Sequence, residues 1–337
     1  MSENIRVYLY PGSLETVKKS GVGQALYHQK SMLEAVGVNV NMDEYRGEGI
    51  IHFNTTFPDS YKAAKKFREE GKKIVYYGHS TQEDFKNSFI GSNLLSPLFK
   101  KWIIKCYNLG DVIITPSEYS KGLLSGYGIN KPIYPLSNGV DTEKFSYSEE
   151  SRERFRKRYG IGDNEKVVIS VGHFMARKGI NDFVGLALRM PECRFMWFGY
   201  TQSYLVPANI KAVMKSAPSN LQFPGYISQE ELRDAYCGAD CFAFMSHEET
   251  EGIVVLEAMS CGIPTVVRDI PVYEGWLKDS ENCFKGSNNR QIMRRVKNII
   301  NGNAPILKAG MAKTVQERSY RVLGEKLINI YKENNFI

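Results

Sequence analysis

Two glutamates, Glu249 and Glu257, lie eight positions apart around the predicted start of an apolar helix at Gly252. Carboxylates accept hydrogen bonds from vicinal hydroxyls, and the free N–H groups of a first helical turn, here Gly252, Ile253 and Val254, can meet a phosphate or sugar oxygen. Acids near a helix N-terminus also complement its dipole, which explains Glu249 but not Glu257 inside an otherwise apolar helix. The stretch therefore predicts a ligand with hydroxyl and phosphate groups.

Two adjacent cations, Arg177 and Lys178, follow a predicted strand and precede a helix that begins near Gly179. A diphosphate carries two negative charges, which Arg contacts with two hydrogen bonds and Lys meets with a point charge. A solvated basic turn is the alternative interpretation. The positive end of the helix dipole at Gly179 favours the anion site.

A glycine-rich turn, with Gly21 and Gly23, follows the first predicted strand and precedes a helix. Glycine permits a tight turn and a close approach of the backbone to an anion at the helix N-terminus. The spacing differs from the dinucleotide fingerprint Gly-x-Gly-x-x-Gly, so an ordinary turn before a helix is the alternative.

These residues need a scaffold that presents them at strand ends, and the sequence indicates one in each half. Short β-branched runs alternate with helical stretches, which is typical of parallel sheets with crossover helices. In the first half we expect strands at residues 5–10, 38–42, 50–54, 73–77 and 112–116, and helices at 23–36, 60–70, 96–107 and 117–127. In the second half we expect strands at 167–171, 194–199, 221–223, 241–245 and 265–268, and helices at 179–188, 229–238, 252–260 and 291–300. One long helix is expected from residue 305 to about 333.

The expected fold class is α/β, with two Rossmann-like, doubly wound domains facing a central cleft. Ligands of open α/β sheets bind outside the carboxyl ends of the strands, where the candidate residues fall. The predicted domains are residues 1–145 and 146–315, followed by a C-terminal helix at 316–337 that can bridge back to the first domain.

The composition excludes several classes of protein. The chain has 337 residues, 42% of them hydrophobic, and 44 Lys or Arg against 37 Asp or Glu give a net charge of +7. Disordered chains, collagens and disulfide scaffolds are excluded, and the mild positive surplus does not indicate nucleic-acid binding. The six cysteines are scattered, as expected for core thiols of a cytosolic protein. Neither a secretory leader nor a membrane-spanning run is expected.

The motif formed by Glu249, seven residues, Glu257 and then Ala-Met-Ser-Cys-Gly-Ile-Pro resembles the signature of retaining GT-B glycosyltransferases of family 4. Other segments match in the family's order: the glycine-rich turn at 21–23, residues 137–141 with Phe145, the Arg-Lys-Gly turn at 177–179, and the loop at 223–228, which resembles the one beside the nucleotide base. The resemblance covers nearly the whole chain. Residues 77–93 are similar to bacterial glycolipid synthases that add a second hexose to monoglucosyl diacylglycerol.

The resemblance implies a role for each matching residue. Glu249 would hold the donor hexose, Glu257 the ribose hydroxyls, and Arg177 with Lys178 the diphosphate. His79 matches the family histidine beside the transferred sugar, although a histidine satisfied within the core is the alternative for it alone. The implied donor-binding set also includes Gly21, Gly23, Tyr226, Ile227, Gly252, Ile253 and Val254.

The implied reaction is transfer of a hexose from UDP-glucose or UDP-galactose with retention at the anomeric carbon. Cations fixed beside the departing diphosphate lower the barrier. The sequence contains no Asp-x-Asp motif to hold a divalent metal, so we expect no metal and no cofactor. One departure matters: His173 stands where many members have Arg, which weakens the case for two separate cations flanking the phosphates.

A basic, apolar helix in the first half predicts a membrane surface. Between residues 62 and 105 there are ten Lys or Arg against four Asp or Glu. The residues expected to face the membrane and acceptor are Leu94, Leu95, Phe99, Lys100, Lys101, Trp102 and Lys105. Such a helix can lie on an anionic bilayer, or it can be an ordinary amphipathic helix packed on the sheet.

The predicted enzyme is therefore a hexosyltransferase that acts on a glycolipid, monoglucosyl diacylglycerol, and forms an α-linked diglycosyl diacylglycerol. The first domain would bind the acceptor and an anionic membrane, and the second the nucleotide sugar. The expected location is cytoplasmic, peripheral on the inner face of the cell membrane, with no nucleic-acid partner. A soluble family-4 enzyme acting on a polysaccharide or small sugar is one alternative, and a non-catalytic sugar-nucleotide-binding module is the other.

Overall fold

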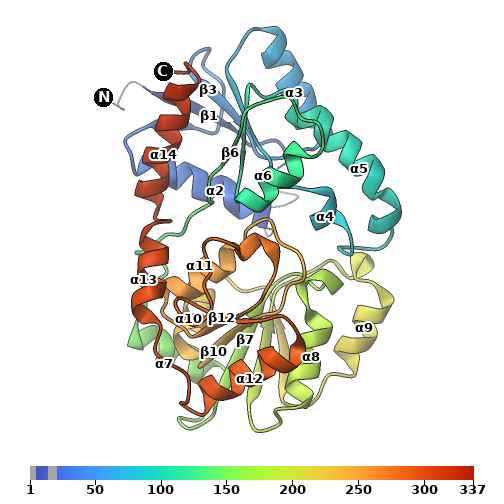
Figure 1. Cartoon of the computed structure of the whole chain (residues 1–337), viewed down its shortest axis with the longest axis vertical. Coiled ribbons are helices and arrows are strands. Elements are labelled where there is room, and N and C mark those ends of the chain that lie inside the picture. The colour runs from blue at the N-terminus through green and yellow to red at the C-terminus, as the bar shows by residue number, and fades with distance from the viewer. Residues whose placement is uncertain (1–4, 14–20) are drawn as a thin grey trace. The chain divides into compact units, whose positions relative to one another are not determined.

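The computed structural model describes residues 5–13 and 21–337, which fold into two compact α/β units (Figure 1). Unit 1 comprises Met1–Phe85, Leu94–Val140 and Glu317–Ile337, and unit 2 comprises Lys86–Asn93 and Asp141–Gln316. Each unit contains one six-stranded sheet whose paired strands are parallel. The predicted α/β fold class is confirmed.

The sheet of unit 1 has the strand order β2-β1-β3-β4-β5-β6. Its strands are β1 (Arg6–Tyr10), β2 (Asn39–Asn41), β3 (Ile50–Phe53), β4 (Ile74–Tyr77), β5 (Val112–Thr115) and β6 (Ile133–Pro135). The order reverses between β1 and β3, and the carboxyl ends at such a switch point are where open α/β sheets bind ligands.

Helices cover both faces of this sheet. They are α2 (Gly21–Glu34), α3 (Pro58–Glu69), α4 (Gln82–Phe85), α5 (Ser92–Tyr107), α6 (Glu118–Ser125) and α14 (Tyr320–Glu333). On one face α14 packs beside α2, and Leu33 and Leu327 are fully buried there. On the other face α3, α5 and α6 contribute Ala64, Ile103 and Leu124 to a second core.

The sheet of unit 2 has the strand order β12-β11-β10-β7-β8-β9, with its switch point between β7 and β10. Its strands are β7 (Val167–Val171), β8 (Arg194–Phe198), β9 (Leu221–Gly225), β10 (Cys241–Phe244), β11 (Thr265–Arg268) and β12 (Phe284–Gly286). The predicted strands of this half all form, and two have the predicted bounds.

The helices of unit 2 lie on both faces of its sheet (Figure 1). They are α7 (Glu149–Arg158), α8 (Ile180–Leu188), α9 (Ala208–Lys215), α10 (Gln229–Gly238), α11 (Ile253–Ser260), α12 (Asn289–Ile300) and α13 (Lys308–Gln316). One core joins α8, α9 and α12 to the sheet through Phe183, Ile210 and Val296. Helix α10 forms with its predicted bounds because Ser228 and Glu231 make a reciprocal capping box at its start.

The single C-terminal helix expected from residue 305 is wrong, because the chain forms two helices, α13 and α14. Between them, the carbonyl of Arg318 accepts a hydrogen bond from the N–H of Val140 at 3.1 Å, and Ser319 pairs with Val140 as an isolated bridge. Backbone groups bonded to another segment cannot also continue a helix. The edge strands β6 and β12 were not predicted, since each has three residues and little alternation.

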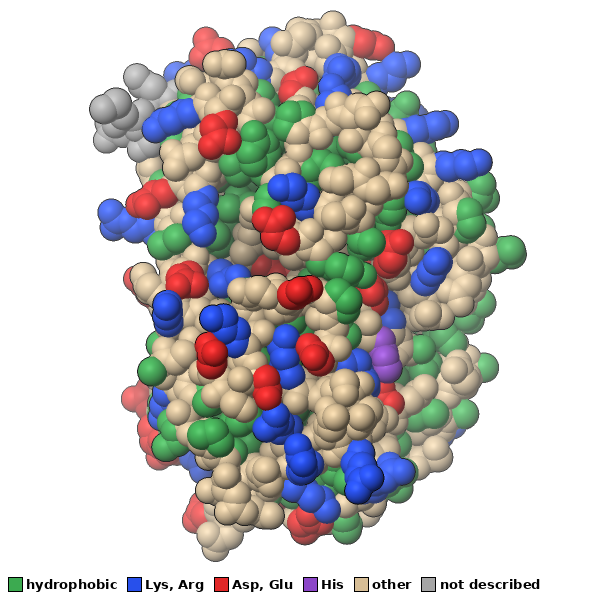
Figure 2. Space-filling view, viewed as in Figure 1, with side chains coloured by type: hydrophobic (Ala, Val, Ile, Leu, Met, Phe, Trp, Pro, Cys, Tyr) green, Lys and Arg blue, Asp and Glu red, His purple; other side chains and the backbone are tan. Residues whose placement is uncertain are grey.

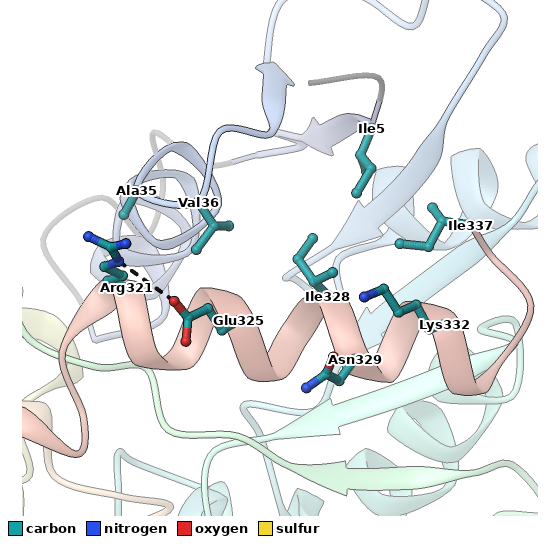
Figure 3. A pocket seen from close by; sticks show the side chains of 9 residues that line it. All are labelled: Ile5, Ala35, Val36, Arg321, Glu325, Ile328, Asn329, Lys332 and Ile337. Atoms are coloured by element: carbon teal, nitrogen blue, oxygen red, sulfur yellow. Dashed lines mark ion pairs between the residues drawn. The ribbon is translucent and has the colours of Figure 1, made fainter. Parts of the chain in front are cut away.

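A pocket of about 490 Å³ lies in unit 1 beside α14, near the end of α2 and the start of β1 (Figure 3). Its lining residues are Ile5, Ala35, Val36, Arg321, Glu325, Ile328, Asn329, Lys332 and Ile337. Ile5 comes directly before β1, so the pocket lies at the amino ends of the strands and not at the edge where ligands are expected. All six cysteines are free and buried, and in the described parts of the chain no helix is long and apolar enough to cross a membrane.

Candidate active site

The switch point of unit 2 brings together the cationic turn and the acidic loop predicted from the sequence. Arg177 and Lys178 lie in a 3-10 turn (Ala176–Lys178) after β7, and Glu249 lies in the loop after β10. Strands β7 and β10 are neighbours in a parallel sheet, so their carboxyl ends share an edge. This pairing explains how residues about 70 positions apart meet.

The turn and the loop are held together through their backbones. The carbonyl of Arg177 accepts hydrogen bonds from the N–H of His247 at 2.7 Å and from Ser246 Oγ at 3.1 Å. Gly179 has φ +79°, and a Cβ there would lie 2.2 Å from the carbonyl oxygen of Met245. Any other residue would push the turn away from β10, so glycine is required at this position.

Lys178 and Glu249 form a buried ion pair. Lys178 Nζ lies 2.5 Å from Glu249 Oε1, and their side chains are 14% and 7% exposed. Burial opposes ionisation of Glu249, but the charges of Lys178 and Arg177 outweigh it and lower the pKa of this carboxyl overall. Glu249 is therefore an ionised acceptor that can bind sugar hydroxyls at neutral pH.

The guanidinium of Arg177 is oriented by two hydrogen bonds within unit 2. Its Nε donates to Ser88 Oγ at 2.8 Å, and its Nη1 donates to the carbonyl of Glu248 at 3.1 Å. Ser88 is buried. Sequence reasoning did not identify Ser88 as a site residue, although it lies in the segment 77–93 that carries the narrower resemblance.

Gly252 directs the chain from the acidic loop into helix α11. It caps the helix with φ +95°, and a Cβ there would lie 3.1 Å from the hydroxyl of Tyr273. The helix begins at Ile253, one residue after the predicted start. Its first turn, including Ile253 and Val254, therefore carries backbone N–H groups that have no acceptor within the helix.

Glu257 is buried within α11 and contacts the hydroxyl of Tyr236. The Tyr236 oxygen lies 3.3 Å from Glu257 Oε2 and 3.2 Å from the carbonyl of Val254. Burial raises the pKa of Glu257 to about 7, and the Tyr236 hydrogen bond and Lys144 only partly offset this. Tyr236, on α10, was missed because nothing in its local sequence links it to α11.

Two further predicted residues, Tyr226 and Ile227, lie at the same edge of the sheet. They follow β9 directly, and the Tyr226 side chain is 45% exposed.

His173, which follows β7, is hydrogen-bonded to the backbone: its Nδ1 lies 2.5 Å from the carbonyl of Tyr200. Burial and the neighbouring Lys178 and Arg177 lower the pKa of His173, although the Tyr200 hydrogen bond opposes them. A neutral His173 does not supply the cation that Arg provides in many members.

The remaining predicted donor-site residues belong to unit 1. His79 follows β4, is buried, and its Nε2 lies 2.9 Å from Asn54 Oδ1. Burial lowers its pKa to about 4, so the ring is neutral at pH 7. Gly21 and Gly23 lie in the first turn of α2, which begins two residues before its predicted start, so the expected glycine-rich turn is helical; residues 14–20, just before it, lie outside the described residues.

Helix α5 has two faces, and the predicted membrane residues are divided between them. Trp102 Nε1 donates to the carbonyl of Thr56 at 2.6 Å, and its ring lies 5.0 Å from that of Tyr61. Phe99 stacks on Phe85 at 4.0 Å. These two aromatic side chains pack on the core of unit 1, so the expectation that they face outward with the leucines is corrected.

The other face of α5 is exposed. Leu94 and Leu98 are 84% and 64% exposed, and Leu95, Lys101 and Lys105 also face solvent. Figure 2 shows Lys or Arg and hydrophobic side chains side by side along the edge where Figure 1 places this helix.

The remaining predicted membrane residue, Lys100, lies only partly on the exposed face of α5. It is half-buried, with its Nζ 4.2 Å from the centre of the Tyr127 ring, so it contributes less to that face than Lys101 and Lys105.

Among the described residues, no group of three or more His, Cys, Asp or Glu side chains is placed to hold a metal. That the reaction needs no metal stays a prediction.

Comparison with known proteins identifies the family. Residues 151–318 match the family model for glycosyl transferases group 1, and residues 49–144 match that for glycosyltransferase family 4. Over 330 residues the chain is 39% identical to the processive diacylglycerol alpha-glucosyltransferase of Acholeplasma laidlawii, and 98% of each chain is covered. The chain belongs to glycosyltransferase family 4.

This glycosyltransferase is also similar to a second enzyme named for glycolipids. It is 29% identical over 268 residues to the alpha-galactosylglucosyldiacylglycerol synthase of Streptococcus pneumoniae, covering 77% of this chain and 70% of that one. The fold resembles Anabaena HepE in complex with UDP and glucose (TM-score 0.78, 15% identity, 98% and 100% of the chains covered). It also resembles sucrose-phosphate synthase from Thermosynechococcus elongatus (TM-score 0.81, 15% identity, 98% and 99% covered). The GT-B fold is therefore confirmed.

Proposed function

We propose that this glycosyltransferase moves glucose or galactose from a UDP-sugar, with retention, to monoglucosyl diacylglycerol and so forms an α-linked diglycosyl diacylglycerol. The observation that carries the proposal is the buried Lys178–Glu249 pair at the switch point of unit 2, in a chain 39% identical to a diacylglycerol glucosyltransferase. The pair supports the proposal because it holds a cation beside an ionised acceptor, the two kinds of group that bind a diphosphate and sugar hydroxyls.

On the donor side, each group has a distinct task. Glu249 accepts hydrogen bonds from the hexose hydroxyls, and Glu257 accepts them from the ribose. Arg177, held by Ser88, and Lys178 bind the diphosphate. The N–H groups of the first turn of α11 bind the remaining phosphate or sugar oxygens, and Tyr226 and Ile227 lie beside the base.

The same cations assist the chemical step. When the bond between the hexose and the diphosphate breaks, negative charge grows on the diphosphate and positive character grows on the anomeric carbon. Arg177 and Lys178 are fixed in place before the reaction, so they stabilise that charge without reorganising. The acceptor hydroxyl attacks from the face that the diphosphate leaves, and the departing phosphate takes its proton, which gives retention without a protein nucleophile.

On the acceptor side, the exposed face of α5 meets the membrane. Leu94, Leu95 and Leu98 can bury apolar area among lipid tails, and Lys101 and Lys105 are attracted to anionic headgroups. Each basic residue near such a surface contributes about 1 kcal/mol. The enzyme would therefore associate reversibly with the inner face of the cell membrane, where a glycolipid acceptor is presented.

The proposal is tested by incubating the protein with each radiolabelled UDP-hexose and vesicles that contain monoglucosyl diacylglycerol. We expect one labelled diglycosyl diacylglycerol whose new linkage is α by NMR. Transfer to water-soluble sugars with none to the lipid would favour a soluble family-4 enzyme. Donor binding with neither hydrolysis nor transfer would indicate a non-catalytic module.

A further inference from the structure

Five buried polar side chains in unit 1 form a continuous chain of hydrogen bonds that ends at His79. Tyr331 of α14 lies 2.7 Å from His52 Nε2, and His52 Nδ1 lies 3.0 Å from Gln29 Oε1. Gln29 and Asn54 are joined by two hydrogen bonds, of 3.3 and 3.1 Å. His79 Nε2 completes the chain at 2.9 Å from Asn54 Oδ1. All five residues are at most 6% exposed.

The chemistry of each partner fixes the direction of these bonds. An amide oxygen can only accept, so the atom that contacts Asn54 Oδ1, His79 Nε2, has to carry a proton. By the same rule His52 Nδ1 donates to Gln29 Oε1. His52 Nε2 is then left with a lone pair, which accepts the hydroxyl hydrogen of Tyr331. Each bond in the chain has one donor and one acceptor.

We propose that Asn54 is a positioning residue for His79, which it holds in the Nε2–H tautomer with Nδ1 as a hydrogen-bond acceptor. Gln29, His52 and Tyr331 act behind Asn54 by fixing the orientation of its amide. The inference rests on the proposed function in one respect, the place of His79 beside the transferred sugar, which the family resemblance implies. The inference also specifies the chemical group that His79 binds. Its unprotonated Nδ1 accepts a hydrogen bond from a sugar hydroxyl and does not pair with a phosphate oxygen.

The neutrality of the network makes the tautomer matter. Burial lowers the pKa of His52 to about 3 and that of His79 to about 4, so both rings are neutral near pH 7. A protonated imidazole would offer donors on both nitrogens, whereas a neutral ring offers one donor and one acceptor. The residue that decides which nitrogen carries the proton therefore decides what His79 can bind.

The network lies at the edge of the sheet where the tautomer of His79 can affect ligand binding. Asn54 follows β3 and His79 follows β4, so both lie at the carboxyl edge of the sheet. Gln29 comes from α2 and Tyr331 from α14, which pack side by side. Residues from three other elements, β3, α2 and α14, thus converge on one imidazole, so a change on the distant α14 can reach His79.

The tautomer is measured directly by two-bond proton–nitrogen correlation NMR on protein labelled with ¹⁵N-histidine. The chain has five histidines, and His79→Gln identifies the His79 signals. We expect a protonated Nε2 and an unprotonated Nδ1 in the parent protein, and a mixture of tautomers in Asn54→Leu. A parent His79 protonated on Nδ1, or an unchanged tautomer in a folded Asn54→Leu protein, overturns the proposal.

Kinetics separate positioning from general damage to the fold. With UDP-hexose and monoglucosyl diacylglycerol vesicles, Asn54→Leu should lower kcat by about ten-fold or more and leave UDP affinity unchanged, since misplaced groups mainly slow the reacting complex. An equal loss of kcat and UDP affinity would indicate a structural role only.

A milder pair of variants keeps the test available if Asn54→Leu does not fold. Tyr331→Phe removes only the hydroxyl at the far end of the network. Tyr134→Phe is its matched control, because the Tyr134 hydroxyl accepts a hydrogen bond from Asn334, just beyond α14, at 3.1 Å without joining the network. We expect shifted His52 and His79 signals and a lower kcat in Tyr331→Phe alone. Equal effects in both variants contradict the proposal.

The NMR result does not depend on the substrate, so the two proposals fail separately. Absence of hexose transfer to the lipid rejects the proposed function and leaves the tautomer result standing. An active transferase whose His79 carries its proton on Nδ1 rejects this inference alone.

Discussion

The two units hold their polar groups in opposite ways. In unit 2 the candidate donor site is ionic: Lys178 and Glu249 are paired at 2.5 Å, and Arg177 is fixed by Ser88. In unit 1 the buried polar groups around His79 are neutral and linked by hydrogen bonds. Fixed charge suits a site where a diphosphate departs, whereas a neutral network suits the orientation of a hydroxyl. The comparison therefore predicts that changes in the two units affect different steps.

Loss of the cation in unit 2 should have the largest effect. Lys178→Ala removes stabilisation of the departing diphosphate, so we expect transfer to slow by about 100-fold or more, with a smaller loss of UDP affinity. The variant also leaves Glu249 buried without its partner, which should destabilise the fold by about 3 kcal/mol. Rates and thermal unfolding should be measured together.

Lys166→Ala is the matched control, since Lys166 pairs with Asp240 at 3.2 Å just before β7 and away from the carboxyl edge. Its transfer rate should equal that of the parent. Similar rates in the Lys178 and Lys166 variants would remove the distinction between the two units.

The exposed face of α5 should control membrane binding without touching the donor site. The double variant Leu94→Ser, Leu98→Ser should weaken binding to anionic vesicles by about ten-fold or more, because two exposed leucines lose their apolar burial in the bilayer. Lys101→Ser with Lys105→Ser should make the remaining binding less sensitive to salt. Sedimentation measures both effects, and UDP affinity should be unchanged.

Ile306→Ser provides the control for the leucines, because Ile306 is 85% exposed in unit 2. It should sediment with vesicles as the parent does. Undiminished binding of the leucine variant would show that α5 is not the membrane face. Trp102 packs inward, so no large change in its emission is expected when vesicles are added.

Protonation of Glu257 should give the donor site a modest pH dependence. Burial raises its pKa to about 7, so UDP affinity should rise a few-fold between pH 6 and pH 8 as the carboxylate forms. The contribution of Glu257 to folding has the opposite sign: the folded protein holds this proton more tightly than the unfolded chain, so the stability that Glu257 contributes falls as the pH rises from about 4.5 to about 7. Calorimetry between pH 6 and pH 8 measures the UDP affinity, and denaturant unfolding between about pH 4.5 and pH 7 measures the stability.

Glu257→Gln should flatten the pH profile of UDP affinity and remove the fall in stability that Glu257 contributes, because the amide does not titrate. A Gln variant with the parent's pH dependence would show that another group is responsible. The neutral network of unit 1 should leave UDP affinity unchanged over this range, but it should raise stability as the pH rises from about 4 to about 6.5, because His52 and His79 stay neutral in the folded protein and are protonated in the unfolded chain.

Removal of metal should have the smallest effect of all. If Arg177 and Lys178 neutralise the diphosphate, the parent should keep its transfer rate in EDTA. Loss of the rate in EDTA, with recovery on addition of magnesium or manganese, would show that the cations of unit 2 are not sufficient.

The same contrast explains how much the sequence could predict. The strands, the Arg177-Lys178 turn and the acidic loop around Glu249 are local patterns, and parallel pairing then brings them together. The network around His79 is different, because Gln29, Asn54 and Tyr331 come from distant segments and no local spacing relates them. Trp102 was misplaced for a similar reason: periodicity shows that a helix has two faces but not which one packs on the core.

A calorimetric titration of UDP into the parent, Glu257→Ala and Asn54→Leu proteins tests the central claim most directly. A carboxylate that contacts ribose hydroxyls makes charge-assisted hydrogen bonds of about 1.5–3 kcal/mol each, so Glu257→Ala should bind UDP at least ten-fold more weakly. Asn54→Leu should bind UDP as the parent does, because its network acts on the sugar and not on the nucleotide. Unchanged affinity in Glu257→Ala, or an equal loss in both variants, would contradict the division of roles between the ionic site and the neutral network.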